Sequence, residues 1–345
     1  MSADIVLWLV QDGITTGAIY ALLALALLLV FAVTRIIFVP QGEFVSYAAL
    51  SLGMLQTGQT PGTVWVLIAG GAIVAVLEGA SALARREPAR LARILAVYVA
   101  GPLAIAALAR WGAAHALGLW AQMAIVAALV VPLGPLLYRI AYRPLADASV
   151  LVLFIVSMAA HYVLSGLGLV IFGGEGLRTN PISEARFDVG VLKIGAQSVW
   201  VTGASLVCMI ALWLFFEHTL VGKALRATAI NRVGARLAGI PAGLTGSIAF
   251  VLAAAIGAAS GVLISPIATI YYDSGLMISL KGFVGAILGG MASYPLAALG
   301  VGLIESFSSF WASALKETIV FTLIIPVLLW RSLASRHPAV EDEEE

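Results

Sequence analysis

The sequence predicts an all-α integral membrane protein, a polytopic helical bundle of about 9–11 membrane segments that includes short or broken helices. Three observations lead to this prediction. Of the 345 residues, 61% are hydrophobic and only 11% are charged, and the mean hydropathy is +1.05. Soluble domains carry about 25% charged residues, so this chain has too few to cover a water-facing surface. Long apolar runs recur along the chain, with Lys and Arg gathered between them.

The apolar runs have the length that a bilayer demands, since about 20 helical residues cross roughly 30 Å of hydrocarbon. Residues 13–34 meet this test without a single charge. The further full-length runs are 63–83, 94–112, 117–139, 150–172, 198–216 and 243–264. Four shorter or interrupted runs cover residues 42–57, 277–291, 296–313 and 316–330. We therefore expect about eleven embedded segments.

The basic residues predict the orientation, because short cytoplasmic loops are enriched in Lys and Arg. Alternating the spans places nearly all loop arginines and lysines on one side: Arg85, Arg86, Arg90, Arg93, Arg139, Arg143, Lys223, Arg226, Arg232, Arg236, Arg331 and Arg336. The N-terminus is then outside and the C-terminus cytoplasmic, which requires an odd number of spans. No positive charge precedes the first run, so a cleaved signal peptide is not expected.

Composition also excludes several classes of function and site. The net charge of +1 gives no field that would attract nucleic acid. One cysteine, Cys208, cannot form an intramolecular disulfide and is expected to pack as a small apolar residue. The four histidines lack ligand spacing, so no metal site is expected. We divide the chain into a transmembrane domain, residues 1–331, and a solvated acidic tail, residues 332–345.

A proline, a glycine and a carboxylate interrupt the apolar sequence between residues 38 and 47. Pro40 removes a backbone donor and Gly42 relaxes the helix, so we expect the chain to break here. Broken backbone at membrane depth survives only in packed protein or beside a water-filled cavity. Glu43 is then either a residue of a transport pathway or a simple cap of the following helix. The polar groups available to such a pathway are Tyr20, Gln41, Gly42, Glu43, Tyr47 and Ser157.

Pairs of glycines at helical spacing predict close approaches between helices. Gly13 and Gly17, Gly257 and Gly261, and Gly285 and Gly289 all have this spacing. The Gly289-Gly290 pair and Pro295 predict a second interrupted helix after Lys281. The glycines expected to pack helices together are Gly17, Gly261, Gly285, Gly289 and Gly290.

The segment from residue 222 to residue 241 is basic and rich in helix-forming residues. It is either a short helix that a cytoplasmic motor grips or a basic anchor without a partner. The residues that we assign to a coupling role are Gly222, Lys223, Ala224, Arg226, Ala227, Asn231, Leu237, Gly239, Ile240 and Pro241. Ala224 stands where a phosphate-binding loop needs Ser or Thr, so this segment is not a nucleotide site.

His161 and Ser157 lie one helical turn apart within an apolar run. They either face a polar path or form a buried, hydrogen-bonded pair. No catalytic motif of a serine hydrolase or zinc protease occurs, so we expect a transport protein rather than an enzyme. If transport uses ATP, hydrolysis takes place on another chain.

Taken in order, several of these stretches resemble the branched-chain amino-acid permease family of bacterial ATP-binding-cassette importers, in particular the first of its two paired permeases. The resemblance covers residues 10–57 and 138–331. It is carried by residues 13–22, Tyr142-Arg143-Pro144-Leu145, residues 222–241, residues 259–263 and residues 281–295. Two departures accompany it. Gln41 replaces the histidine of the family's Asn-Phe-Ala-His-Gly-Glu run, and residues 60–115 look like an extra pair of spans.

The resemblance implies a subunit of the bacterial cytoplasmic (inner) membrane that carries branched-chain or related amino acids inward. It also implies a second homologous permease, two cytoplasmic ATPase subunits and an extracytoplasmic binding protein. This chain then needs no cofactor of its own, because ATP and Mg²⁺ bind the ATPase subunits. The alternative is an ion-coupled transporter that works alone, with Glu43 or Asp273 as the ion-linked carboxylate.

Overall fold

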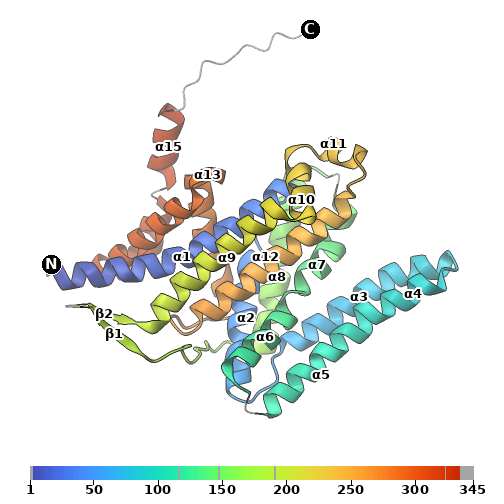
Figure 1. The fold of residues 1–345 in the computed structure, drawn as a ribbon, viewed down its shortest axis with the longest axis horizontal. Helices are drawn as coiled ribbons and strands as arrows, with labels where there is room; N and C mark the ends of the chain where they lie inside the picture. The colour runs from blue at the N-terminus through green and yellow to red at the C-terminus, as the bar shows by residue number, and fades with distance from the viewer. Residues whose placement is uncertain (1–2, 116, 147, 190–191, 323, 335–345) are drawn as a thin grey trace, which may run out of the picture.

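In a computed structural model, residues 3–115, 117–146, 148–189, 192–322 and 324–334 are described. The acidic tail beyond residue 334, with Arg336, lies outside them. Long helices lie side by side and run diagonally across the view (Figure 1). The main helices are α1 (Ala3–Thr34), α2 (Gln41–Gln56), α3 (Thr63–Ala84), α4 (Pro88–Leu95), α5 (Gly101–Ala114), α6 (Leu119–Val130), α7 (Leu133–Leu137), α8 (Val150–Phe172), α9 (Ala196–His218), α10 (Leu220–Ile230), α11 (Arg232–Leu237), α12 (Ala242–Ile264), α13 (Ser274–Trp311), α14 (Lys316–Thr322) and α15 (Ile324–Ala334).

The fold class expected from the sequence is confirmed. Within the described residues, seven helical segments are long and apolar enough to cross a membrane, and they match the seven full-length runs. The shorter runs also form helices, namely α2, the two halves of α13, and α14 with α15. The chain is thus a polytopic, all-α membrane protein with several short or broken helices.

Prolines shape the helices at two places. A π-helical turn, Ala96–Ala100, joins α4 to α5 just before Pro102, and a second one, Tyr138–Tyr142, extends α7 just before Pro144. A proline lacks the N–H that a regular α-helical turn would use, and a wider turn accommodates that loss. A 3₁₀ turn, Arg143–Leu145, then ends the span that begins at Leu119.

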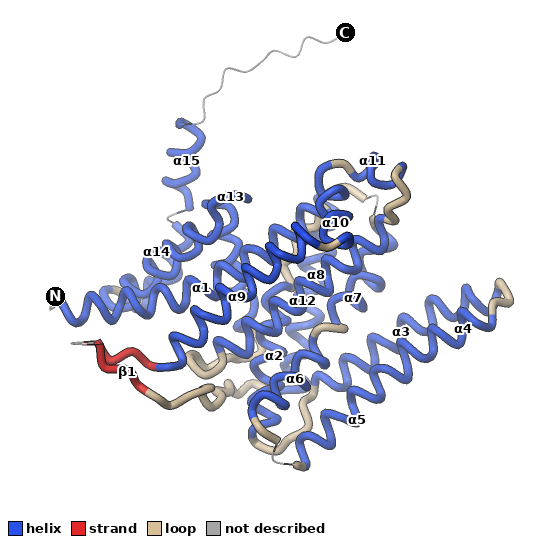
Figure 2. The backbone as a smooth tube through the Cα atoms, viewed as in Figure 1, coloured by secondary structure: helices blue, strands red, loops and turns tan. Residues whose placement is uncertain are grey.

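One feature of the fold was not expected. Strands β1 (Arg186–Val189) and β2 (Leu192–Gly195) form an antiparallel hairpin that pairs Arg186 with Gly195, in the loop between α8 and α9 (Figure 2). Polar and apolar residues alternate along residues 186–189, the period of a strand. The strand was not predicted because this alternation covers only four residues, whereas the helical pattern of the flanking spans is long.

The two ends of the bundle differ in charge. The basic end holds α10 and α11, the α3–α4 connection and residues 138–145, while the strand end holds β1 and β2 and the connections at residues 57–62 and 173–185 (Figure 1). Ten arginines and lysines lie at the basic end: Arg85, Arg86, Arg90, Arg93, Arg139, Arg143, Lys223, Arg226, Arg232 and Arg236.

The centre of the molecule is built from α1, α2, α12 and α13, which pack on one another and carry much of the buried core. Helices α3, α4 and α5 form a separate hairpin on one side, seen at the lower right of Figure 1. Its outer face is exposed and apolar, with Trp65 and Val76 about 70% accessible. Side chains of this kind suit a lipid-facing surface.

Candidate functional site

The predicted break after the first span is present. Helix α1 ends at Thr34, Arg35 has a positive φ of 62°, and no helix forms again until Gln41. The Gln41 side chain donates a hydrogen bond of 3.0 Å from Nε2 to the carbonyl oxygen of Ala253. Ala253 stands at the midpoint of α12. Helix α2 therefore begins halfway through the bundle rather than at its surface.

Glu43, in the first turn of α2, is hydrogen-bonded to His161 of α8 across 2.8 Å, between Oε1 and Nδ1. Both side chains are buried, with the Glu43 side chain 1% and the His161 side chain 5% exposed. His161 stands at the midpoint of α8, so the pair lies at the same depth as the start of α2. Glu43 is thus a buried residue of the bundle centre and not a cap at the membrane interface.

Three buried side-chain oxygens beside this pair have no hydrogen-bond partner: Gln41 Oε1, Glu43 Oε2 and Ser46 Oγ. Leaving such a group unpaired costs about 1–3 kcal/mol, so buried polar atoms are normally satisfied. Their concentration within the first six residues of α2 makes this helix end a buried polar spot in an otherwise apolar bundle centre. It is the strongest candidate for a functional site in the described part of the chain.

Two of the other predicted pathway residues have structural partners instead. The Tyr47 hydroxyl donates to the carbonyl oxygen of Leu164 at 2.7 Å. The Ser157 hydroxyl lies 3.0 Å from that of Tyr142, in an aromatic cluster. His161 and Ser157 are therefore both buried and hydrogen-bonded, each to another element rather than to each other.

Tyr20 lies in a different cluster from Gln41 and Glu43. Its hydroxyl donates to Glu305, and Lys281 Nζ lies 2.5 Å from Glu305 and 3.1 Å from Glu317. This cluster joins α1, both halves of α13 and α14. The sequence analysis did not single out Glu305 and Glu317. Their position inside C-terminal apolar runs was the available signal, because ionisable residues within spans are rare and need partners.

Four of the five glycines predicted to pack helices do so, namely Gly17, Gly261, Gly285 and Gly289. A Cβ atom on Gly17 would lie 2.7 Å from Leu299 Cα, and one on Gly285 would lie 2.9 Å from Ala298 Cβ. Gly261 packs against Val45 and Ala48 of α2, and Gly289 against Tyr294. Gly290 has φ 58° and ψ −161°, which breaks α13 into two antiparallel halves, as the glycine pair and Pro295 predicted.

The basic segment from residue 222 to residue 241 forms two short helices, α10 and α11, where one was expected. Thr219 caps the first at 2.9 Å and Asn231 caps the second at 2.9 Å, each accepting a backbone N–H three residues later. Gly239, with φ 83°, turns the chain into α12. Large apolar side chains point outward from the pair: Leu220, Ile230 and Leu237 are 79–86% exposed. Such side chains on a surface outside the spans indicate a contact with another protein or the membrane.

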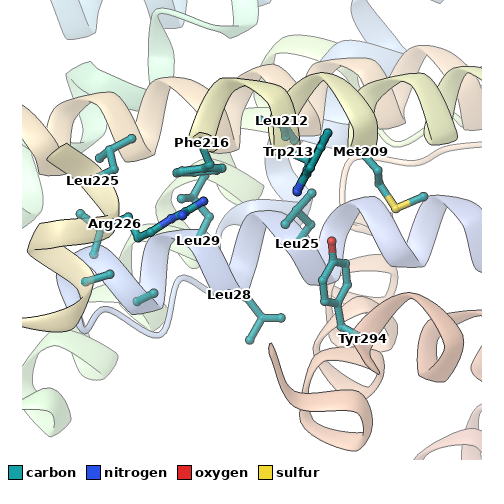
Figure 3. Close-up of a pocket in the computed structure, with 13 residues that line it drawn as sticks. Leu25, Leu28, Leu29, Met209, Leu212, Trp213, Phe216, Leu225, Arg226 and Tyr294 are labelled. Atoms are coloured by element: carbon teal, nitrogen blue, oxygen red, sulfur yellow. The ribbon is translucent and has the colours of Figure 1, made fainter. Parts of the chain in front are cut away.

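A cavity of about 350 Å³ opens between α1, α9 and α10 (Figure 3). Leu25, Leu29, Trp213 and Phe216 line its apolar part, and Arg226 and Tyr294 reach it from opposite sides. Arg226 also forms a 2.9 Å ion pair with Glu217. The first of the two helices lies against the end of α9, and its buried Leu225 packs with Leu29 and Val33 of α1.

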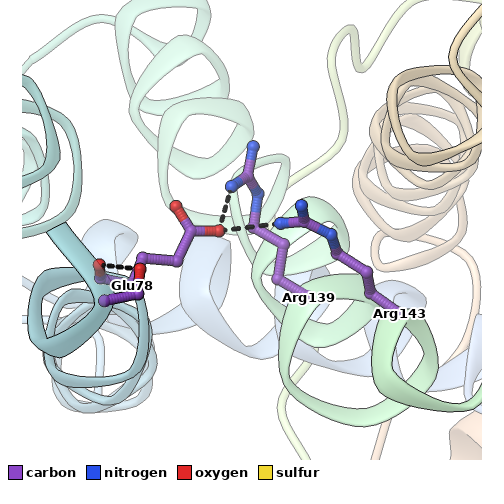
Figure 4. A network of polar contacts seen from close by, with 4 residues as sticks. Glu78, Arg139 and Arg143 are labelled. Atoms are coloured by element: carbon purple, nitrogen blue, oxygen red, sulfur yellow. Dashed lines mark hydrogen bonds and ion pairs between the residues drawn. The ribbon is translucent and has the colours of Figure 1, made fainter. Parts of the chain in front are cut away.

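The hairpin of α3, α4 and α5, which the sequence predicts to be an extra pair of spans, contacts the bundle at the basic end through one carboxylate. Glu78 of α3 accepts hydrogen bonds from Arg139 at 2.5 Å and from Arg143 at 3.0 Å (Figure 4). Arg139 also lies 5.2 Å from the centre of the Tyr98 ring. Arg143 belongs to the Tyr-Arg-Pro-Leu stretch noted in the sequence, so the α3–α5 hairpin contacts the basic end at that point.

Among the described residues, no three side chains of His, Cys, Asp or Glu gather as metal ligands. The geometry is that of a membrane bundle with a polar, unsatisfied centre and an exposed pair of helices at its basic end. Comparison with known proteins then decides the family. The family model described as the permease component of the branched-chain amino acid transport system matches residues 89–329.

The chain belongs to this family. It is 25% identical over 339 residues to the high-affinity branched-chain amino acid transport system permease protein LivH of Escherichia coli K12, covering 92% of this chain and 91% of the relative. It is 27% identical over 293 residues to the corresponding permease protein BraD of Pseudomonas aeruginosa, covering 81% of this chain and 94% of the relative. No solved structure matches. This permease-family member is thus a multi-pass transport protein rather than an enzyme.

Proposed function

We propose that this chain is the membrane-spanning permease of an ATP-driven importer that carries branched-chain or related amino acids into the bacterial cytoplasm. The observation that carries the proposal is the family match over most of the chain, including α10 and α11. The relatives are named as permeases of branched-chain amino acid transport systems. We extend their substrate class to this chain.

The partners in this proposal are a second, similar permease, two ATPase subunits on the cytoplasmic side and an external binding protein. The ATPase subunits hold the ATP and Mg²⁺. The pair α10 and α11 is the contact for one ATPase subunit, since it projects from the basic end with exposed leucine and isoleucine side chains. The positive-inside rule supports a cytoplasmic basic end, an N-terminus outside and a C-terminus inside.

The solute path in this proposal passes the N-terminal end of α2. Gln41, Gly42 and Glu43 lie there, with the unpartnered oxygens that a polar solute or water can satisfy. Tyr47 and Ser157 line the same region and hold α2 and α8 in place through their hydrogen bonds. Tyr20 belongs instead to the Lys281–Glu305–Glu317 cluster, where its hydrogen bond to Glu305 links α1 to α13 and has a structural role.

A second candidate function rests on the Glu43–His161 pair. A buried carboxylate with one free oxygen is also what an ion-coupled transporter uses. In that case Glu43 or Asp273 binds the coupling ion, and the single chain transports without ATP.

Affinity purification of the tagged chain from native membranes, followed by mass spectrometry, tests the proposal. We expect a second permease and ATPase subunits to co-purify. Recovery of the chain alone, still active in liposomes without ATP, would move the assignment to the ion-coupled transporter.

The role of α11 is tested by Leu237→Asp, at a side chain that is 85% exposed. A charge on this contact should lower both ATPase recovery and uptake by roughly tenfold, which corresponds to about 1.4 kcal/mol of binding. Leu83→Asp is the matched control, because Leu83 is 67% exposed at the tip of the α3–α4 hairpin, at the same end of the bundle. Equal ATPase recovery with both variants would remove α11 from the contact.

A further inference from the structure

The cavity between α1, α9 and α10 lies in the half of the membrane next to the basic end. On α1 its lining runs from Leu25 to Val33, just before this helix ends at Thr34. That stretch is about 12 Å long at 1.5 Å per residue. One leaflet contributes about 15 Å to the hydrocarbon core of a bilayer. The cavity therefore has the depth of the acyl chains in the leaflet on the basic side.

The walls of the cavity are mostly apolar. Leu25 and Leu29 of α1 and Met209 and Leu212 of α9 contribute to them (Figure 3). Trp213 of α9 also lines the cavity and is 60% exposed, so the cavity opens to the surface of the bundle. At this depth that surface faces lipid. An apolar hollow accepts an acyl chain there, whereas it offers water too few polar partners.

Cations gather at the end of the cavity nearest the basic end. Arg226 of α10 lines the cavity, and its guanidinium group points between α9 and α1 (Figure 3). Lys223 lies one helical turn earlier on α10, and the exposed Arg35 follows the last residue of α1. Glu217 pairs with Arg226 at 2.9 Å, and the two side chains are 47% and 48% exposed. Three cations thus gather about this one carboxylate, and a phosphate group can neutralise the excess.

The apolar hollow and the cations together indicate the kind of ligand. Basic pockets between membrane spans on the cytoplasmic side bind the headgroups of anionic lipids. The aliphatic part of an arginine side chain covers apolar surface while its charge stays at the membrane interface. Arg226 is placed to do both, because it lines the cavity and is also half exposed.

We propose that this cavity is a binding site for an anionic phospholipid of the leaflet on the basic side. One acyl chain lies between α1 and α9, and the phosphate accepts hydrogen bonds from Arg226, beside Lys223 and Arg35. The bound lipid packs beneath α10, the first helix of the proposed ATPase contact, and connects it to α1 and α9. Such a site is independent of the proposed transport function.

Native mass spectrometry of the purified chain, titrated with dioleoyl phosphatidylglycerol, tests the site. Arg226→Gln should lower the affinity for the first bound lipid by roughly fivefold, since one cation is lost. Arg90→Gln is the matched control, because Arg90 forms a similar ion pair with Glu87 at the same end, with side chains 45% and 44% exposed. The control should bind phosphatidylglycerol as the wild type does. Equal affinity in all three proteins would overturn the site.

Glu217→Gln separates a phosphate ligand from a purely structural ion pair. Like Arg226→Gln, it breaks the pair between these two residues, but it leaves the cation free. The affinity for phosphatidylglycerol should therefore rise, by roughly threefold. Glu87→Gln, which breaks the control pair in the same way, should leave this affinity unchanged. A fall in affinity with Glu217→Gln would overturn Arg226 as the phosphate ligand.

The place of the acyl chain is tested by Ala32→Trp, which fills the cavity that Ala32 lines. We expect the affinity for phosphatidylglycerol to fall by roughly tenfold. Ala104→Trp, on an exposed position of α5, is the control and should have no effect. Excess glycerol 3-phosphate should not displace the lipid, because it lacks an acyl chain. Complete displacement would assign the site to a small anion and overturn the phospholipid.

A helix of a second permease is the competing occupant of the cavity. The same titration on the complex purified from native membranes distinguishes the two. Phosphatidylglycerol binding that still depends on Arg226 in the complex supports the lipid. Loss of the Arg226-dependent binding in the complex, although the chain alone shows it, would overturn the lipid as the occupant in the membrane.

Discussion

Helices α12 and α3 are almost equal in length and apolarity, with 23 and 22 residues and mean hydropathies of 2.3 and 2.0. Yet α12 is buried in the centre of the bundle, while α3 exposes Trp65 and Val76 on the outside. Small residues occupy every side of α12, so that α1, α2 and α6 all approach it closely. In α3 large side chains dominate the outer face.

In this chain, hydropathy identifies the membrane spans. The distribution of small residues decides which spans lie in the centre of the bundle and which lie at its edge. Lipid is as apolar as leucine, so burying an apolar side chain between helices gains little. Close backbone approach and polar partners decide the arrangement instead. Both are concentrated in α1, α2, α12 and α13, whereas among the described residues the α3–α5 hairpin is tied to the bundle through Glu78 at one end and Thr63 at the other.

The largest effect is expected from Lys281→Met in the centre. It leaves Glu305 and Glu317 without their cation, and removing one partner of a buried ion pair costs about 3–5 kcal/mol. The amount of folded protein and its unfolding midpoint in detergent should both fall. Adding Glu305→Gln removes one of the two stranded charges and should recover part of the loss. An unchanged midpoint in the single variant would show that the cluster contributes nothing to the centre.

A smaller effect is expected when a carboxyl group in the bundle centre and one on the α3–α5 hairpin are replaced in turn. Glu43→Gln replaces the carboxyl group that is hydrogen-bonded to His161 and should lower uptake by roughly tenfold or more, a change of about 1.4 kcal/mol in the transport barrier. The same substitution at Glu78, a partly exposed carboxylate, removes ion pairs worth about 0.2–1 kcal/mol and should change uptake less than twofold. Initial rates of leucine uptake, corrected for protein amount, compare the two. Equal losses would abolish the distinction between centre and edge.

The smallest effect is expected from excision of the hairpin. Gly58 lies beside Ala113, with a spacing of 3.6 Å from a Cβ on Gly58 to the Ala113 carbonyl oxygen, so the two ends of the hairpin meet. Replacing residues 64–112 with a short Gly/Ser linker keeps the hydrogen bond between Ser51 and Thr63. Uptake by the shortened chain should fall no more than about threefold, since lipid can cover the apolar faces of the bundle that the hairpin leaves exposed. Complete loss of uptake in a correctly inserted chain would make the hairpin part of the machinery.

Much of the fold could be predicted because its main determinant is local. A run such as residues 150–172 is long, uncharged and uninterrupted, and it forms α8 with the same bounds. The breaks at residues 35–40 and at Gly290 were also predicted, because Pro40, Gly42 and the Gly289-Gly290 pair weaken a helix locally. These features depend on a few neighbouring residues.

The site was only partly accessible from the sequence because its geometry is non-local. Gln41, Gly42 and Glu43 were identified, but their depth depends on Ala253, more than 200 positions away. The partners of Tyr20 were missed because Glu305 is 285 positions distant. The packing of α2 on α12 and of α13 on α1 likewise follows from contacts that no short pattern contains.

The requirement for ATP is measured most directly in liposomes that contain the co-purified complex, with ATP and Mg²⁺ inside and radiolabelled leucine with the binding protein outside. An ATP-driven importer accumulates leucine only when ATP is present, and liposomes with this chain alone accumulate none. Leucine accumulation by the purified chain alone, driven by a proton or sodium gradient without ATP, would contradict this account.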